Sequence, residues 1–129
     1  MSRGRSHKVP VTMNNYKFTK GRGRIKVSLL AQYMGSDLVV FIYNENAHIG
    51  AVAVGEYDRE ERRASQSVIM RVGHRDDVVA QEAARSISKH TRKPVCVIVG
   101  IHLNQITDVE ISDILENTRS LISGFIKEL

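Results

Sequence analysis

Residues 95–111 read VCVIVGIHLNQITDVEI and join the end of one predicted element to the start of another. The run VCVIV at 95–99 is apolar at every position, which predicts a strand that is covered on both faces. Thr107 and Glu110 have the T-x-x-E spacing of a capping box, so a helix is expected to begin directly after Thr107. This stretch therefore predicts a buried strand followed closely by a well-capped helix.

Apolar residues continue at helical spacing from this cap almost to the last residue. The stripe consists of Ile111, Ile114, Leu115, Leu121, Ile122, Phe125, Ile126 and Leu129. A stripe of this width predicts a helix that either covers a sheet or pairs with a second copy of the chain. Another helix is predicted from Asp76 or Asp77 to about Thr91, because its first turn is acidic, its end is basic and Pro94 follows.

Four strands are expected before these helices. They span residues 25–34, 38–43, 49–55 and 65–72. Gly35-Ser36 predicts a hairpin between the first two strands, and the charged residues 56–64 predict a solvated hairpin tip between the last two. The segment 38–43 is apolar on both faces and predicts a central strand. Gly50 and the alanines after it leave room for a helix or a ligand to approach closely.

These elements predict a single α+β domain over residues 16–129, with a mainly antiparallel sheet of about five to six strands and two helices. Four consecutive strands indicate an antiparallel meander. The helix between the fourth and fifth strands indicates a crossover that sets the fifth strand parallel to the fourth. Residues 1–15 have no sustained period, and we expect them to form a flexible basic arm.

The net charge of +5 belongs to the start of the chain. Residues 1–26 hold eight basic residues and no acidic one, and the remaining residues have a formal charge of −3. The segment GRGR at 21–24 is a weak indication of nucleic-acid binding, and a solvated arm is the simpler interpretation.

No run of 18 apolar residues and no secretory signal are present, so we expect no membrane span and a cytoplasmic protein. The single cysteine, Cys96, excludes an internal disulfide and is expected to be a core residue.

Three histidines are expected at strand ends: His48, His74 and His102. If the fifth strand runs parallel to the fourth, all three imidazoles lie at one rim of the sheet. Both helices begin just after two of these histidines, and helix N-termini favour anions such as phosphate. Arg75 and Asn104 belong to the same rim, which would suit a phosphate-bearing small molecule.

Simpler interpretations compete with this site. Each histidine taken alone is more often a hydrogen-bonded structural residue, and the acidic residues at the first helix and Thr107 at the second are able to cap those helices themselves. The three histidines with Asp76 could instead bind zinc or iron as in a metal-dependent hydrolase, although their spacing matches no metal motif. No nucleophile-elbow, phosphate-loop or dinucleotide-binding motif is present, so nothing in the chain requires an enzyme.

Three segments of this rim resemble the prenylated-flavin chaperone-like domain. They are NENAHIGAVAVGE (44–56), VGHRDD (72–77) and VCVIVGIHLNQITDVEI (95–111), within a resemblance that covers about residues 22–128. That family is associated with gallate-type, prenylated-flavin-dependent decarboxylases, and its fold resembles the proteasome assembly chaperones. The resemblance implies His48, Gly50, His74 and His102 as cofactor-contacting residues, to which the rim argument adds Arg75 and Asn104.

The resemblance implies a non-catalytic accessory protein that helps a flavin-dependent decarboxylase gain or keep prenylated FMN or FMN. A protein-assembly chaperone without a small ligand is the alternative, with the helix stripe or a sheet edge as its surface. Self-association into a dimer or larger homo-oligomer is expected in either case, because a wide apolar helix and open strand edges need cover.

Overall fold

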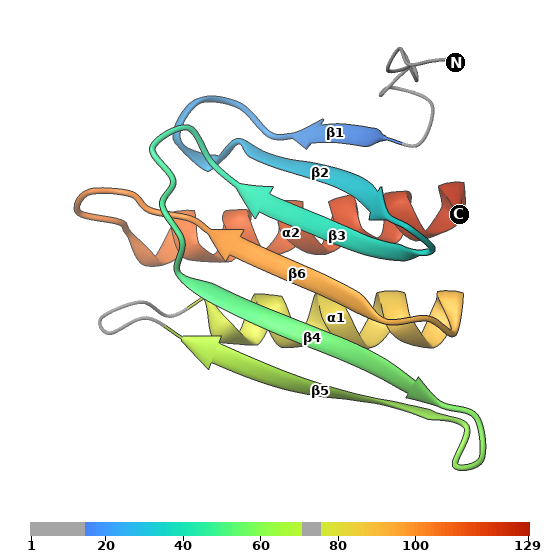
Figure 1. Cartoon of the computed structure of the whole chain (residues 1–129). Helices are drawn as coiled ribbons and strands as arrows, with labels where there is room; N and C mark the ends of the chain where they lie inside the picture. Colours follow the sequence, from blue (N-terminus) through green and yellow to red (C-terminus); the bar gives the residue numbers. More distant parts are fainter. Residues whose placement is uncertain (1–14, 71–75) are drawn as a thin grey trace, which may run out of the picture.

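Six strands and two helices make up the part of the chain that the structure describes, residues 15–70 and 76–129 of a computed structural model (Figure 1). The strands are β1 (Tyr16–Lys20), β2 (Val27–Met34), β3 (Asp37–Tyr43), β4 (Ala51–Asp58), β5 (Arg63–Met70) and β6 (Val95–Gly100). The helices are α1 (Asp77–Thr91) and α2 (Asp108–Glu128), and a short 3-10 helix, η2 (Gly23–Ile25), precedes β2. Both long helices lie on one face of a single sheet with the order β1-β2-β3-β6-β4-β5. The predicted α+β class is confirmed.

The predicted meander is wrong. β3 and β4 are consecutive in the chain but do not pair, because β6 lies between them, parallel to β3 and antiparallel to β4. β6 does run in the same direction as β5, as the crossover indicated, but β4 separates the two. The last strand in the sequence therefore occupies the centre of the sheet, where its apolar run has a neighbour on each side.

β1 was not expected as a strand, and it adds an edge to the sheet beside β2. The aromatic rings of Tyr16 and Phe18 lie 5.2 and 6.3 Å from the ring of Phe125 in α2, measured between ring centroids. The strand expected from residue 25 begins at Val27, because Ile25 belongs to η2. The charged tip between β4 and β5 is also shorter than expected, since both strands extend into it.

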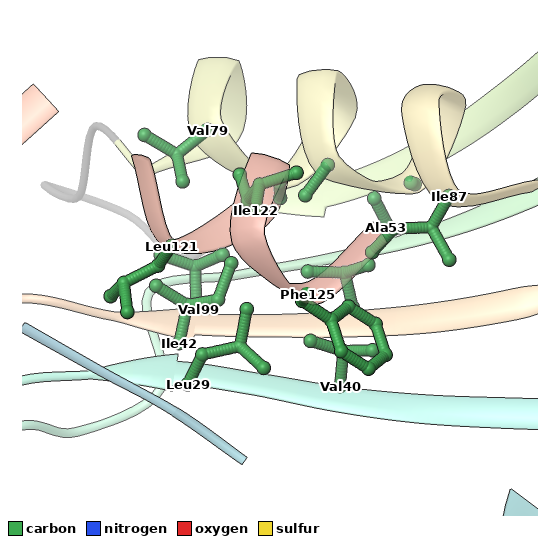
Figure 2. Close-up of a cluster of buried hydrophobic side chains, with 14 of the residues drawn as sticks. Leu29, Val40, Ile42, Ala53, Val79, Ile87, Val99, Leu121, Ile122 and Phe125 are labelled. Carbon is green, nitrogen blue, oxygen red and sulfur yellow. The ribbon is translucent and has the colours of Figure 1, made fainter. Parts of the chain in front are cut away.

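The hydrophobic core lies between the helices and one face of the sheet (Figure 2). In β6, Val95, Val97 and Val99 are buried, whereas Cys96 and Ile98 on the opposite face are only partly buried. The prediction that this strand is covered on both faces is therefore wrong for the single chain. The stripe of α2 covers the sheet, with Phe125 fully buried.

The helices are joined to each other by an ion pair. Arg119 of α2 donates to the carboxylate of Glu82 in α1, with the two shortest nitrogen–oxygen distances at 3.2 Å. Because both side chains are largely exposed, this pair is expected to contribute little to stability. The arrangement of the two helices is set mainly by the core beneath them.

Candidate functional site

The start of β4 and the ends of β5 and β6 form one rim of the sheet. Ala51, the first residue of β4, pairs with Met70 at the end of β5 and with Val99 near the end of β6. His48 precedes β4 and His102 follows β6, and their ring centroids are 5.2 Å apart. The structure therefore brings together two of the three predicted histidines. His74 and Arg75 lie outside the described residues.

Two glycines allow the chain segments of this rim to approach closely. The N–H of Gly50 donates to the carbonyl of Val99 at 2.8 Å, and a Cβ at Gly50 would collide with the carboxylate of Asp76. A Cβ at Gly100 would collide with the backbone carbonyl of His48. The approach predicted at Gly50 is thus made by a side chain at the start of α1.

Asp76 joins the start of α1 to the end of β6. It occupies the N-cap position of α1, but its side chain makes no capping hydrogen bond to the helix. Its Oδ2 instead accepts a hydrogen bond from the backbone N–H of Ile101 at 3.2 Å. This places a carboxylate between β4, β6 and α1.

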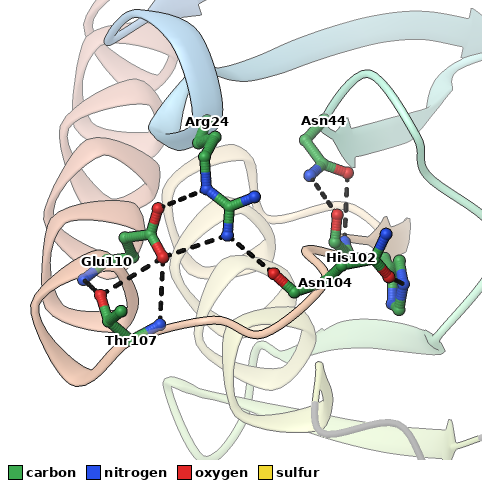
Figure 3. A network of polar contacts seen from close by, with 6 residues as sticks. All are labelled: Arg24, Asn44, His102, Asn104, Thr107 and Glu110. Carbon is green, nitrogen blue, oxygen red and sulfur yellow. Dashed lines mark hydrogen bonds and ion pairs between the residues drawn. The ribbon is translucent and has the colours of Figure 1, made fainter.

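Asn44 holds the loop that carries His102. Its side chain is buried, its Nδ2 donates to the carbonyl of His102 at 2.7 Å, and its Oδ1 accepts from the N–H of His102 at 3.1 Å (Figure 3). Nε2 of His102 lies 3.1 Å from Oδ1 of Asn104, so this predicted residue contacts the imidazole directly. The ring of His102 is thereby positioned by contacts on both its backbone and its side chain.

Arg24 attaches the segment before β2 to the same loop and to α2 (Figure 3). Its Nε lies 2.6 Å from Oε2 of Glu110, and its Nη2 donates to Oε1 of Glu110 at 3.2 Å and to the carbonyl of Asn104 at 2.8 Å. The hydrogen bond from Arg24, and next the backbone N–H of Thr107, lower the pKa of Glu110 to about 2. A basic residue of the expected solvated lead-in is therefore part of the folded domain.

The start of α2 already holds a negative charge. The predicted capping box is confirmed: the Thr107 hydroxyl accepts from the N–H of Glu110 at 3.1 Å, and the Glu110 carboxylate accepts from the N–H of Thr107 at 3.0 Å. A carboxylate with a low pKa thus occupies the positive end of the helix dipole. The alternative interpretation, in which Thr107 itself satisfies this helix start, agrees with the structure.

Two pockets meet at the loop after β6. One, of about 520 Å³, lies between the starts of α1 and α2. It is lined by His48, Asp76, Val79, Ile101, His102, Leu103, Ile106, Ile111, Ile114 and Leu115. The other, of about 260 Å³, is mainly polar and includes Arg24, Lys26, Asn46 and Asn104 in its lining. His102 and Leu103 line both, so an apolar pocket and a polar pocket share one wall.

The sequence interpretation missed Arg24, Lys26 and Asn44 as residues of this region. Arg24 stands in the GRGR segment that was considered only for nucleic acid, and nothing local to that segment indicates a partner 86 residues away. Asn44 begins the NEN triplet just before His48, and its buried position depends on how β3 and β6 pair.

No metal cluster supports the alternative of a metal-dependent hydrolase within residues 15–70 and 76–129, where no group of three or more potential ligands is found. Within the same residues, neither helix is long and apolar enough to span a membrane. His74, which that metal site required, lies outside the described residues.

Residues 21–129 match the model of a family described as the prenylated flavin chaperone LpdD-like domain. A solved chain from the crystal structure of a novel chaperone complex for yeast 20S proteasome assembly has the same fold, with a TM-score of 0.60 and 12% sequence identity. The match covers 91% of this chain and 99% of that chain. A comparison with curated proteins gave no match.

Proposed function

This chain belongs to the prenylated flavin chaperone LpdD-like domain family, and on that premise we propose that it is a non-catalytic accessory protein that holds prenylated FMN or FMN at the rim. The partner we propose is a prenylated-flavin-dependent, gallate-type decarboxylase. When bound to that partner, the flavin supplies the decarboxylation chemistry, and this chain supplies only a binding surface.

The observation that carries the proposal is the pair of pockets on either side of His102. Small-molecule sites are mostly apolar with a few convergent polar groups, and occupy about 300–1,000 Å³. The larger pocket fits this description, because aliphatic side chains line most of it and His48, Asp76 and His102 supply polar groups. This chemistry suits a flat, largely apolar ring system.

The smaller pocket suits the phosphate end of the same ligand. Arg24 and Lys26 contribute positive charge to it and Glu45 contributes a negative charge, while Asn46 and Asn104 contribute amide groups. Because Glu110 neutralises Arg24, Lys26 is the cation we assign to the phosphate. This assignment moves the anion from the helix N-termini, where the sequence placed it, to the polar pocket. Gly50 keeps the start of β4 close to Asp76, and His74 and Arg75 stay predictions.

Titration of the purified protein with FMN and with prenylated FMN tests the proposal, with flavin fluorescence and calorimetry as readouts. We expect saturable binding of at least one flavin, and a loss of affinity of about tenfold or more for His102→Ala, since a hydrogen bond to a charged group contributes about 1.5–3 kcal/mol. His48→Ala and Lys26→Ala are expected to weaken binding as well.

His90→Ala is the matched control, because His90 lies in the last turn of α1, at the opposite end of that helix from the rim. We expect His90→Ala to bind flavin as the unchanged protein does. Absence of binding for both flavins, or equal affinities for the His102 and His90 variants, would refute the flavin site.

A second candidate function is a protein-assembly chaperone that binds no small ligand. The exposed apolar side chains Ile106, Val109 and Ile111 at the start of α2 favour it, since they form an apolar surface beside the rim. Affinity capture from the native host separates the candidates: recovery of a flavin-dependent decarboxylase supports the first, and recovery of unrelated assembling subunits without any flavin affinity supports the second.

A further inference from the structure

The face of the sheet opposite the helices is apolar across five strands. The pairing register aligns one side chain from each of β2, β3, β6, β4 and β5 in a row on this face: Leu30, Phe41, Ile98, Val52 and Ile69. A neighbouring row has Val39, Cys96 and Val54 at its centre, with the polar residues Gln32 and Ser67 at its two ends. We call these two rows the open face.

The open face is partly or fully exposed in the single chain. Its central members are partly buried by one another, whereas Val54 is 42% exposed and Ile69 is 76% exposed. Both helices contact the opposite face, and within the described residues no element packs on this one. Figure 1 shows it turned toward the viewer. Strands that are apolar on both faces are normally covered on both, so the composition of β3 and β6 calls for cover that residues 15–70 and 76–129 do not provide.

The chemistry of the open face limits what covers it. Lys17, at the β1 end of the longer row, is the charged residue in register with the two rows. A strongly charged partner such as a nucleic acid would find little to pair with here. Beside residues 47–49 this face is hollowed by about 300 Å³ between Leu30, Phe41 and Ile98. An apolar surface of this kind fits another apolar surface, and a two-fold symmetric interface brings two identical surfaces together.

The whole side of the sheet opposite the helices, with the apolar open face at its centre and polar residues such as Ser28 and Glu56 around it, has a size that suits a dimer. Six strands about 4.8 Å apart, with about seven residues of about 3.3 Å each, give a sheet face of roughly 650 Å² in projection. A stable protein–protein interface buries about 800 Å² of accessible surface per partner. Accessible surface follows the contours of the side chains, so it is larger than the projected area of the same face. Sheets stacked in this way have interdigitating side chains and lie about 10 Å apart.

We propose that a second copy of this chain covers the open face, so that two sheets stack against each other and the helices form the outer layers of the dimer. The larger rim pocket is bounded by α1, α2 and the loop after β6. The smaller one reaches the edge of the open side, because Ser28 and Tyr43 belong to its lining. The proposal rests on the two apolar rows and does not rest on flavin binding.

Sedimentation velocity over a range of concentrations tests the interface, with Val54→Glu as the variant. Val54 is exposed in the single chain, so the substitution is compatible with folding, which far-UV circular dichroism checks. In a stacked dimer the new carboxylate is buried without a partner, and we expect the dimer dissociation constant to rise about tenfold or more. Val109→Glu is the matched control, because Val109 is 69% exposed on α2, and it is expected to leave the dimer unchanged.

Cys96 allows a second test that needs no destabilising variant. It is the chain's single cysteine and lies in β6, near the middle of the open face. In the dimer this thiol is covered, so its rate of modification by a maleimide is expected to fall as the protein concentration is raised through the dimer dissociation constant. Partial burial raises the pKa of the Cys96 thiol, so the reaction is run at mildly alkaline pH. A Cys96→Ser/Val109→Cys variant is expected to react at a rate that does not depend on protein concentration, and the same independence at Cys96 would count against the proposal.

Three results would overturn the proposal. One is a monomer at millimolar concentration, and another is a dimer that Val109→Glu weakens and Val54→Glu does not. The third is a Val54→Glu variant that keeps the dimer but loses capture of a different protein, which would assign the open face to that partner.

Discussion

Glu110 serves two structural purposes with one carboxylate. It completes the capping box of α2 through the N–H of Thr107, and it accepts two hydrogen bonds from Arg24 in the segment before β2. The helix start, the polar pocket and the N-terminal edge of the sheet are therefore connected at a single residue. The pKa of about 2 shows that the folded protein strongly favours the ionised form.

This pKa predicts a specific loss of stability in acid. An ordinary glutamate has a pKa of 4.5 and that of Glu110 is about 2, so the unfolded chain binds a proton at a pH where the folded chain does not. The stabilising contribution is complete above about pH 4.5 and is lost as the pH falls toward about 2. We expect the melting temperature of the unchanged protein to exceed that of Glu110→Gln at neutral pH, with a difference that shrinks through this window.

Thermal melts between pH 7 and pH 2.5 measure that difference. Glu116→Gln, a change of an exposed glutamate in the same helix, is the control and is expected to show a much weaker dependence. A Glu110→Gln difference that stays constant with pH would contradict the assignment.

Some residues of the rim could be predicted because their positions follow from strand ends. Strand direction places His48 and His102 at the same edge of the sheet, as predicted. The pairing of β4 with β6, which was not predicted, brings their rings to 5.2 Å. Asn44 and Arg24 could not be predicted, because their partners are 58 and 86 residues away in the sequence. Short polar side chains have no periodicity that indicates such long-range contacts.

The element α2 shows where local sequence determines local structure. Its start was predicted from four residues, because a capping box satisfies its own N–H groups without help from the rest of the fold. β1 was missed for the opposite reason. Its five residues alternate only briefly, and its place depends on contact between Tyr16 and Phe125 in α2.

Gly124 of α2 provides a prediction at this scale. A Cβ there would meet no atom within 4 Å, and glycine inside a helix costs about 0.5–1 kcal/mol relative to alanine. We therefore expect Gly124→Ala to increase the free energy of unfolding by about that amount, measured by urea denaturation.

Gly100→Ala is the contrasting variant. Its Cβ would collide with the backbone carbonyl of His48, so the end of β6 must shift and stability is expected to fall. Equal effects of the two substitutions would show that the close approach at the rim is not structurally important.

At the scale of the whole molecule, β6 joins the strands β1 to β3 to the hairpin of β4 and β5. It pairs with β3 on one side and with β4 on the other, and both helices pack over the core that results. The α+β class, the hairpins and the helices could be predicted from periodicity and turn residues. The strand order could not, because an apolar strand fits equally well beside β5 or between β3 and β4 until the core is assembled.

This connection predicts one cooperative unfolding transition. The strands β1 to β3 lie on one side of β6, and β4 and β5 lie on the other. If β6 unfolds, both groups lose the strand they pair with, so neither group is expected to stay folded alone. Urea transitions followed by far-UV circular dichroism and by tyrosine fluorescence are expected to coincide. Val97→Ala, at a fully buried position of β6, is expected to shift both transitions equally. Two separated transitions would contradict this view.

The central position of β6 also has a consequence for synthesis on the ribosome. Residues 27–43 and 51–70 leave the ribosome well before residues 95–100, so β3 and β4 must wait as unpaired edges until β6 emerges. Both edges are rich in apolar, β-prone residues, and such edges aggregate readily while they are exposed. The nascent chain is therefore most vulnerable just before its last strand emerges, and a protein of this fold itself stands to gain from assistance during its own production.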